Sequence, residues 1–146
     1  LLDRFGLSVE VASPKIIEDR VEVIKRRNDF ENDKESFLKK WTSEDEKLRK
    51  KIVKAKLSYK SIEISEEMLK KCAELCLTLG ADGLRGELTL IRSIKALAAY
   101  GGNKKAEKSH LKAVASSALR HRLRRDPLDE TGTSTRVEKA LNKILG

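Results

Sequence analysis

The 146-residue sequence is poor in residues that interrupt a chain or build β-structure: two prolines, eight glycines and 4% aromatic residues. So few prolines and glycines leave little room for long irregular stretches. Scarce aromatic residues, beside an apolar set dominated by Leu, Ile, Val and Ala, suit helix faces better than strands of a β-sandwich. No apolar run approaches the roughly 18–20 residues that cross a bilayer, so no membrane span is predicted.

Cysteine and histidine are also scarce. Cys72 and Cys76 lie four residues apart, so on a helix they share one face, where a disulfide between neighbouring turns has poor geometry. Two thiols without a nearby His or a further Cys are too few for a structural zinc site. His110 and His121 are separated by about three helical turns, too far to bind one metal from the same helix. We therefore predict packed, reduced thiols and no metal site.

The chain is rich in charge. Its 32 Lys+Arg residues against 23 Asp+Glu give a formal net charge of +9, which attracts nucleic acid, acidic membranes, acidic partners or nucleotide phosphates. Acids and bases are interspersed almost everywhere, a pattern typical of solvated helix faces, and only Arg120–Arg125 is a local basic cluster. A basic helical nucleic-acid-binding module stays an alternative, although helix-turn-helix spacing and an aromatic stacking platform are missing.

Helical periodicity and capping residues predict the order of elements. In the first third, Ser13-Pro14 predicts a helix start, Glu35–Trp41 is a short separate segment, and Ser43–Glu46 is a capping box that opens another helix. Ile62 and Ile64 predict a short extended link. Four longer helices follow, and short connections favour an antiparallel bundle. Their predicted limits are Ser65 to Gly80, Asp82 or Gly83 to Gly101-Gly102, Ser109 to Asp126-Pro127, and Thr135 onward.

Residues Leu7–Val11 alternate apolar and polar side chains, as a short half-buried strand does. A single strand is not stable by itself. Its partner strands are therefore expected outside this sequence, and the chain is expected to be a piece of a longer protein.

Few residues suggest chemistry by spacing alone. Gly102–Ser109 approaches a phosphate-binding loop, but Glu107 stands where the second glycine is needed and no apolar strand precedes it, so we reject that reading. Arg4 precedes the predicted strand, and Arg85 lies at a predicted helix start with its guanidinium able to reach away from the apolar face. By spacing alone, both are surface or salt-bridged arginines, and catalysis is unsupported.

Four stretches of the sequence resemble, in the same order, the I subunits of magnesium chelatase, which are AAA+ ring ATPases. The likeness continues into the tail at residues 132–137 and so runs through the whole chain. Four matching stretches in the right order are far more specific evidence for a family than one motif. The stretches are Leu1–Val9 (LLDRFGLSV), Arg20–Arg27 (RVEVIKRR), Gly83–Leu90 (GLRGELTL) and Leu119–Leu128 (LRHRLRRDPL).

The resemblance implies a fold and two site residues. The fold is mainly α, an antiparallel helical bundle of the AAA+ C-terminal lid type, preceded by a short strand left over from the α/β ATPase core. By the same resemblance, Arg4 is the arginine finger that reaches a neighbour's ATP, and Arg85 is the sensor-2 arginine that meets the γ-phosphate. A planar, permanently charged guanidinium suits the charge on a transferring phosphoryl group. The implied domains are 1–12 (end of the core), 13–64 (connecting helices) and 65–146 (bundle).

The implied function belongs to the full subunit. It assembles into a ring and, with a D subunit and a porphyrin-binding H subunit, uses ATP and Mg²⁺ to insert Mg²⁺ into protoporphyrin IX for (bacterio)chlorophyll synthesis. The expected location is the cytoplasm, or the plastid stroma in a plant or alga. No Walker A, Walker B or sensor-1 segment is present here, so this piece alone is expected to hold no cofactor and to be inactive.

Two questions stay open within the resemblance. The cluster Arg120–Arg125 either binds the D subunit or the next protomer, or is a solvated helix end. The chain could also be a D subunit or the related cobalt-chelatase motor. D subunits continue into an acidic, proline-rich linker and an integrin-like domain, whereas this sequence stops soon after Leu145-Gly146, which favours subunit I.

Overall fold

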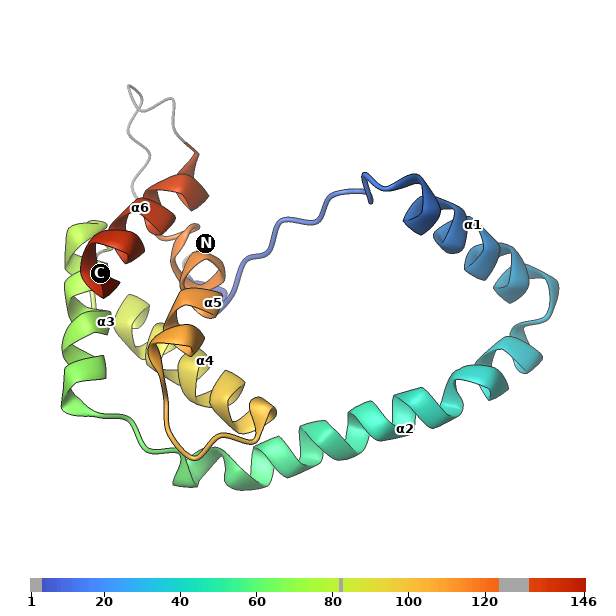
Figure 1. Ribbon diagram of the computed structural model, residues 1–146, viewed down its shortest axis with the longest axis horizontal. Helices are drawn as coiled ribbons and strands as arrows, with labels where there is room; N and C mark the ends of the chain where they lie inside the picture. The colour runs from blue at the N-terminus through green and yellow to red at the C-terminus, as the bar shows by residue number, and fades with distance from the viewer. Residues whose placement is uncertain (1–3, 82, 124–131) are drawn as a thin grey trace. The chain divides into compact units, whose positions relative to one another are not determined.

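A computed structural model describes residues 4–81, 83–123 and 132–146 (Figure 1). The chain forms two compact units: Glu10–Val53 is one, and Leu1–Val9 with Lys54–Gly146 is the other, called here the bundle unit. The predicted mainly α fold is confirmed. The helices are α1 (Ile17–Asn32), α2 (Lys34–Ser58), α3 (Glu66–Thr78), α4 (Arg85–Gly101), α5 (Lys108–Leu119) and α6 (Thr133–Leu145), with a short 3₁₀-helix, η2 (Tyr59–Ser61), after α2.

Helix α1 begins later than the sequence predicted. Ile16 is its N-cap and supplies no side-chain hydrogen bond, so the start predicted at Ser13-Pro14 is wrong. A Ser-Pro pair permits a helix start but does not force one. The acidic residues Glu18 and Asp19 lie in the observed first turn, where negative charge interacts favourably with the helix N-terminus.

Helix α2 is one continuous helix, so the separate elements predicted at Glu35–Trp41 and Ser43–Glu46 are wrong. No proline or glycine interrupts the stretch. The Thr42 hydroxyl donates to the Leu38 carbonyl at 2.9 Å, which satisfies a polar side chain inside a helix without ending it. Capping residues in the middle of such a stretch are therefore compatible with the helix.

A small aromatic cluster lies at the corner between α1 and α2, although neither helix buries any residue. Phe30 and Phe37 meet edge to face with ring centroids 5.6 Å apart, and the Phe37 and Trp41 centroids are 6.0 Å apart. The Arg26 guanidinium lies 4.8 Å from the Trp41 ring centroid, within cation–π range. Asp33 caps α2 by accepting the N–H of its third residue at 3.0 Å. Local contacts therefore fix this corner.

Both predicted limits of α3 are confirmed. The Ser65 side chain accepts the Met68 N–H at 3.2 Å and caps the start. Gly80 takes the left-handed conformation, with φ +64°, just after the helix. The N–H of Ala81 then bonds back to the Cys76 carbonyl at 3.0 Å, as in a Schellman motif.

The start of α4 was predicted slightly too early. Gly83 has φ +75° and therefore lies outside the helix, which begins at Arg85; the other predicted start, Asp82, lies outside the described residues. The predicted glycine stop is confirmed, because Gly102 adopts the left-handed conformation with φ +78° at the C-terminal cap.

Helix α5 starts with a reciprocal cap and ends earlier than predicted. Glu107 and His110 form a capping box, in which the Glu107 N–H donates to His110 Nδ1 at 3.0 Å, so the helix begins one residue before the predicted Ser109. It ends at Leu119 instead of continuing to Asp126-Pro127, which lie outside the described residues.

The extended link predicted at Ile62 and Ile64 is confirmed and is tied to the connection between α4 and α5. The Glu63 N–H donates to the Lys104 carbonyl at 3.0 Å, and the Ala106 N–H donates to the Glu63 carbonyl at 2.8 Å. These two bonds form a short parallel bridge. The link therefore fixes one edge of the bundle unit without a sheet.

The core lies within α3 to α6, each of which contributes one apolar stripe. Helix α6 begins before the predicted cap Thr135 but still buries Val137 and Leu141 as predicted. Full burial of an aliphatic side chain contributes roughly 1.5–3 kcal/mol, so this layer supplies most of the unit's stability. The fully buried large side chains are Leu75, Leu90, Ile94, Leu111, Leu119, Val137, Cys72 and Cys76.

The strand predicted at Leu7–Val11 is not formed; these described residues are extended without regular secondary structure. A strand needs a neighbour that exchanges ladder bonds with it. Here the Ser8 N–H instead donates to the Ser117 carbonyl, at 2.8 Å, near the end of α5. The segment is thus attached to a helix end.

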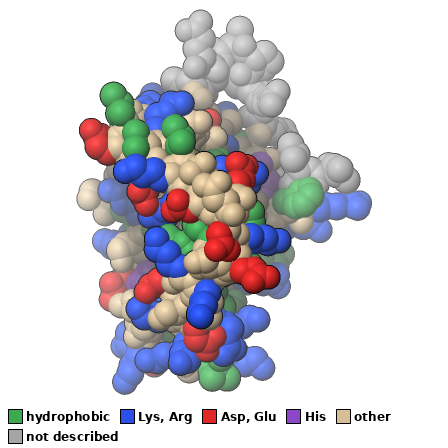
Figure 2. Space-filling model, turned by 90° about the vertical axis from the view of Figure 1, so that its right-hand side faces the viewer, with side chains coloured by type: hydrophobic (Ala, Val, Ile, Leu, Met, Phe, Trp, Pro, Cys, Tyr) green, Lys and Arg blue, Asp and Glu red, His purple; other side chains and the backbone are tan. Residues whose placement is uncertain are grey.

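Surface charge is distributed much as predicted. Figure 2 shows basic and acidic side chains interspersed over the face it presents. Exposed pairs such as Arg26–Glu22 at 2.7 Å and Arg27–Glu31 at 2.6 Å join successive turns of α1; such pairs contribute little stability. Residues 10–53 hold 12 basic and 11 acidic side chains, so most of the net charge lies on the bundle unit. Among the described residues, none of the helices combines the length and the apolar composition of a membrane span.

The prediction of packed thiols is confirmed, since Cys72 and Cys76 are both free and fully buried. Burial raises the pKa of the Cys72 thiol to about 11. Burial, followed by the nearby Glu87 carboxylate, raises the pKa of the Cys76 thiol to about 12. At neutral pH both behave as small apolar side chains.

Leu75→Ala and Leu77→Ala form a matched pair on α3, because Leu75 is fully buried and Leu77 is 83% exposed. We expect Leu75→Ala to lower the free energy of unfolding by about 2–5 kcal/mol, since it leaves a cavity. Leu77→Ala should change it by less than about 0.5 kcal/mol. Urea unfolding followed by circular dichroism measures both, and equal losses would contradict the assigned core.

The buried thiols also predict a pH dependence of stability. Each keeps its proton more tightly in the folded chain than in the unfolded chain, where the pKa is near the ordinary 9.0. Their contribution is therefore complete below about pH 9 and is lost as the pH rises towards 11–12. We expect the stability difference between wild type and the double variant Cys72→Ala/Cys76→Ala to shrink over that interval. A difference independent of pH would show that the thiols are accessible.

Candidate functional site

The first predicted site residue, Arg85, is the first residue of α4 and is exposed. The preceding residue, Leu84, is the N-cap and makes no side-chain hydrogen bond to the helix. The first N–H groups of a helix lack intrahelical partners and carry a partial positive charge. The guanidinium and this helix start therefore place positive charge in one exposed location.

Gly86, the next residue, anchors this helix start against the core. A Cβ atom at Gly86 would lie 3.6 Å from each of three neighbours: Ala81 Cβ, Cys76 Sγ and Leu119 Cδ2. Cys76 lies in α3, Ala81 in the connection after it and Leu119 at the end of α5, so the first turn of α4 packs between two other helices. Arg85 thus projects from a fixed backbone.

Glu87 places a carboxylate in the first turn of α4. Its Oε2 atom is buried and has no hydrogen-bond partner, and its charge contributes to the raised pKa of Cys76. A carboxylate in the first turn interacts favourably with the positive helix end, which partly offsets the burial of the charge.

The second predicted site residue, Arg4, is exposed and lies in a segment attached to the end of α5. The Phe5 carbonyl, one residue later, accepts two bonds: from Arg122 Nη2 at 2.7 Å and from His121 Nε2 at 2.9 Å. The Ser8 N–H donates to the Ser117 carbonyl at 2.8 Å. The segment is therefore held on both sides of Gly6 and Leu7.

Arg122 connects this segment to two helices. Its Nε donates to the Ala118 carbonyl of α5 at 3.0 Å, and its Nη2 lies 3.4 Å from Thr89 Oγ1 on α4. Thr89 is one helical turn beyond Arg85. One guanidinium therefore links the backbone beside Arg4 to the helix that begins with Arg85.

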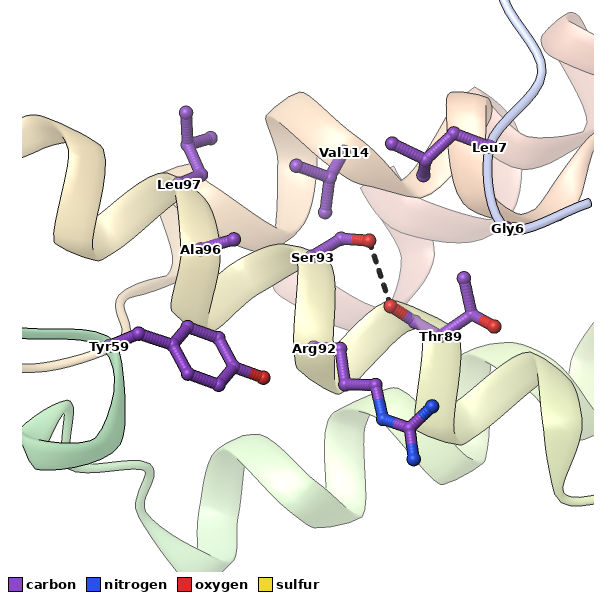
Figure 3. Close-up of a pocket in the computed structure, with 9 residues that line it drawn as sticks. All are labelled: Gly6, Leu7, Tyr59, Thr89, Arg92, Ser93, Ala96, Leu97 and Val114. Atoms are coloured by element: carbon purple, nitrogen blue, oxygen red, sulfur yellow. Dashed lines mark hydrogen bonds between the residues drawn. The ribbon is translucent and has the colours of Figure 1, made fainter. Parts of the chain in front are cut away.

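An apolar groove of about 580 Å³ lies beside this connection. Figure 3 shows Leu7 and Val114 toward one side of α4 and Tyr59 and Arg92 toward the other. The Ser93 hydroxyl is turned inward and donates to the Thr89 carbonyl at 2.8 Å. The groove is lined by Gly6, Leu7, Tyr59, Thr89, Arg92, Ser93, Ala96, Leu97 and Val114.

The basic cluster Arg120–Arg125 is only partly a surface feature. Its first residues, Arg120, His121 and Arg122, are half-buried, while Arg124 and Arg125 lie outside the described residues. His121 and Arg122 contact the chain's own backbone. In its described part, the cluster builds the fold.

Sequence reasoning found Arg4 and Arg85 but missed the roles of Arg122 and Thr89. The sequence did contain a signal that Arg122 faces inward. Arg122 continues the three- and four-residue spacing of the buried residues of α5, which are Leu111, Ala115 and Ala118. Within the parts of the chain that the structure describes, no three His, Cys, Asp or Glu side chains converge as a metal site would require. The site's chemistry is cationic: Arg4 and Arg85 are exposed residues, and guanidinium groups suit phosphate oxygens.

Comparison with known proteins places this geometry in context. Residues 69–141 match the AAA lid domain family. The crystal structure of a candidate ATPase from Cytophaga hutchinsonii is similar in fold, with a TM-score of 0.68 at 20% identity, over 97% of this chain and 46% of that one.

Two curated relatives show the level of sequence similarity. The magnesium-chelatase 38 kDa subunit of Cereibacter sphaeroides is 51% identical over 99% of this chain and 43% of the relative. The magnesium-chelatase subunit ChlI of Anabaena variabilis is 36% identical over 100% of this chain and 43% of the relative. The chain thus spans less than half the length of these relatives.

The packing at Gly86 predicts opposite effects for two substitutions. Its neighbours lie at ordinary van der Waals distance from an added Cβ, so Gly86→Ala should raise stability by about 0.5–1 kcal/mol through a better helix propensity. Gly86→Leu should lower it by about 1–3 kcal/mol, because the larger side chain has no room between α3 and α5. Urea midpoints distinguish the two, and a stable Leu variant would argue against the wedged first turn.

Proposed function

Because the chain belongs to the AAA lid domain family, we propose that it is the C-terminal helical part of the ATPase motor subunit of magnesium chelatase. The whole subunit would drive the ATP-dependent insertion of Mg²⁺ into protoporphyrin IX in (bacterio)chlorophyll synthesis. Support comes from relatives with 51% and 36% identity whose names state magnesium chelatase. Residues 65–146 would be the lid, residues 13–64 the connecting helices, and residues 1–12 the end of the ATPase core.

The observation that carries the proposal is the exposure of Arg4 and Arg85 on one compact unit. In this role Arg85 meets the γ-phosphate of ATP, and Arg4 reaches the ATP of a neighbouring subunit as an arginine finger. Both groups are permanently charged and planar, so they stabilise the charge that spreads over a transferring phosphoryl group. Bound ATP with Mg²⁺ supplies that phosphoryl group and the free energy of its transfer.

This chain would supply only part of the nucleotide site. The nearest match to a phosphate-binding loop, Gly102–Ser109, is used otherwise: Gly102 ends α4 and Glu107 caps α5. The phosphates would therefore be held mainly by other parts of the motor. The chain alone should neither bind MgATP tightly nor hydrolyse it.

The proposed partners follow from the same assignment. The subunit would form a ring with copies of itself, bind the D subunit, and act on the porphyrin-binding H subunit in the cytoplasm or the plastid stroma. Membership in the I subunits is preferred over the D subunit or a cobalt-chelatase motor because both relatives named above are magnesium-chelatase subunits, one of them named ChlI, and the alignments cover nearly the whole chain.

The test uses the full-length subunit with Arg4→Ala or Arg85→Ala. We expect both variants to retain ATP binding and to lose most hydrolysis, since such an arginine contributes roughly 10³–10⁵-fold to the rate. Binding is measured with a fluorescent ATP analogue, and turnover by phosphate release. Lys112→Ala, an exposed position on α5, is the control, and wild-type turnover in either arginine variant would refute the role given to that residue.

A further inference from the structure

We infer that Arg122 is a positioning residue for Arg4: it holds the segment that carries Arg4 in a fixed place on the bundle unit. The inference rests on the proposed function, because it concerns how the arginine finger is presented. In this role Arg122 binds the chain's own backbone and does not form a docking surface.

The geometry at Arg122 is that of a three-way connection. One guanidinium donates to the Phe5 carbonyl at 2.7 Å and to the Ala118 carbonyl at 3.0 Å, and it reaches Thr89 Oγ1 at 3.4 Å. The acceptors belong to the N-terminal segment, α5 and α4. Because the guanidinium group is rigid and planar, its hydrogen bond to one acceptor restricts the positions that the other two acceptors can take.

The contact acts directly on the backbone next to Arg4. Phe5 is its immediate neighbour, and the Phe5 carbonyl accepts from both Arg122 and His121. The second attachment, from the Ser8 N–H to the Ser117 carbonyl, fixes the direction in which the segment leaves the bundle. Between the two attachments, Leu7 lines the same apolar groove as Val114 (Figure 3).

Apolar packing alone holds this segment weakly. Phe5 is 61% exposed and Leu7 is 53% exposed, so each buries only part of its side chain. A hydrogen bond from a charged donor contributes more than one between neutral groups. The hydrogen bond from Arg122 to the Phe5 carbonyl, together with the one from His121, therefore does more than the apolar contacts to hold the segment that carries Arg4.

A misplaced finger is costly for catalysis. A displacement of about 1 Å in a group that acts on the transition state can reduce the rate about 10²-fold. Arg4 is itself exposed, so its placement depends on the backbone at Phe5. Through Thr89, one turn beyond Arg85, the same guanidinium also sets the Arg4 segment relative to the proposed sensor-2 helix.

The experiment is a double-mutant cycle in the full-length subunit, with Arg4→Ala, Arg122→Ala, their combination, and Arg122→Lys. We expect Arg122→Ala to reduce kcat at least tenfold with the KM for ATP changed less than twofold. Lysine should not rescue it, because one ammonium cannot serve the three acceptors in the same geometry. Most informatively, the double variant should be no slower than Arg4→Ala alone, since Arg122 acts through Arg4.

The outcomes separate this inference from the proposed function. If Arg4→Ala retains wild-type turnover, the finger assignment fails, and the positioning role fails with it. If Arg4→Ala is inactive but Arg122→Ala is unimpaired, or the two losses multiply, only the positioning role is overturned. Lys112→Ala serves again as the control for charge removal on α5.

Hydrogen exchange keeps the inference testable if Arg122→Ala lowers stability. Loss of the attachment should speed exchange of the Ser8 amide at least tenfold, while amides of α3 and α4 keep their protection. Unchanged Ser8 exchange overturns the inference, as does an equal loss of protection throughout the bundle, which would show a general structural role.

Discussion

The burial of one apolar stripe from each of four helices, α3 to α6, is the constraint on which the rest of the structure depends. Cys76, Leu90 and Leu119 are fully buried where these stripes meet. A Cβ atom at Gly86 would lie 3.6 Å from two of these three side chains, so the core leaves little room beside the start of α4, from which Arg85 projects. Helices α1 and α2 bury no residue, and their corner relies on local aromatic contacts.

Much of the fold could be predicted because the signals were local. Ser65 accepts a backbone N–H three residues later, and Gly80 and Gly102 take a left-handed conformation that other residues avoid. Such effects act within one turn and do not need tertiary context. Predictions failed where a residue allows a helix to start but does not require it to. Ser13-Pro14 and Ser43 are compatible with helix starts, but no helix starts at either.

The candidate site was predictable only in part, for a physical reason. Arg4 and Arg85 were identified by resemblance to a family, and the structure places both side chains at exposed positions. Their roles stay proposals. The connection through Arg122 joins residues 117 positions apart, and no periodicity within one helix encodes such a contact. A basic run seen in the sequence could equally be a surface patch or, as His121 and Arg122 are here, internal donors.

The aromatic cluster at the α1–α2 corner has a consequence for any optical study of this protein. The chain has a single tryptophan, Trp41; it lies against Phe37 and the Arg26 guanidinium and does not belong to the core formed by α3 to α6. Its fluorescence therefore follows the melting of that corner. The bundle, with only Tyr59 and Tyr100 as weaker fluorophores, is almost silent, so emission reports on the corner alone, whereas helical circular dichroism sums over the helices of both units.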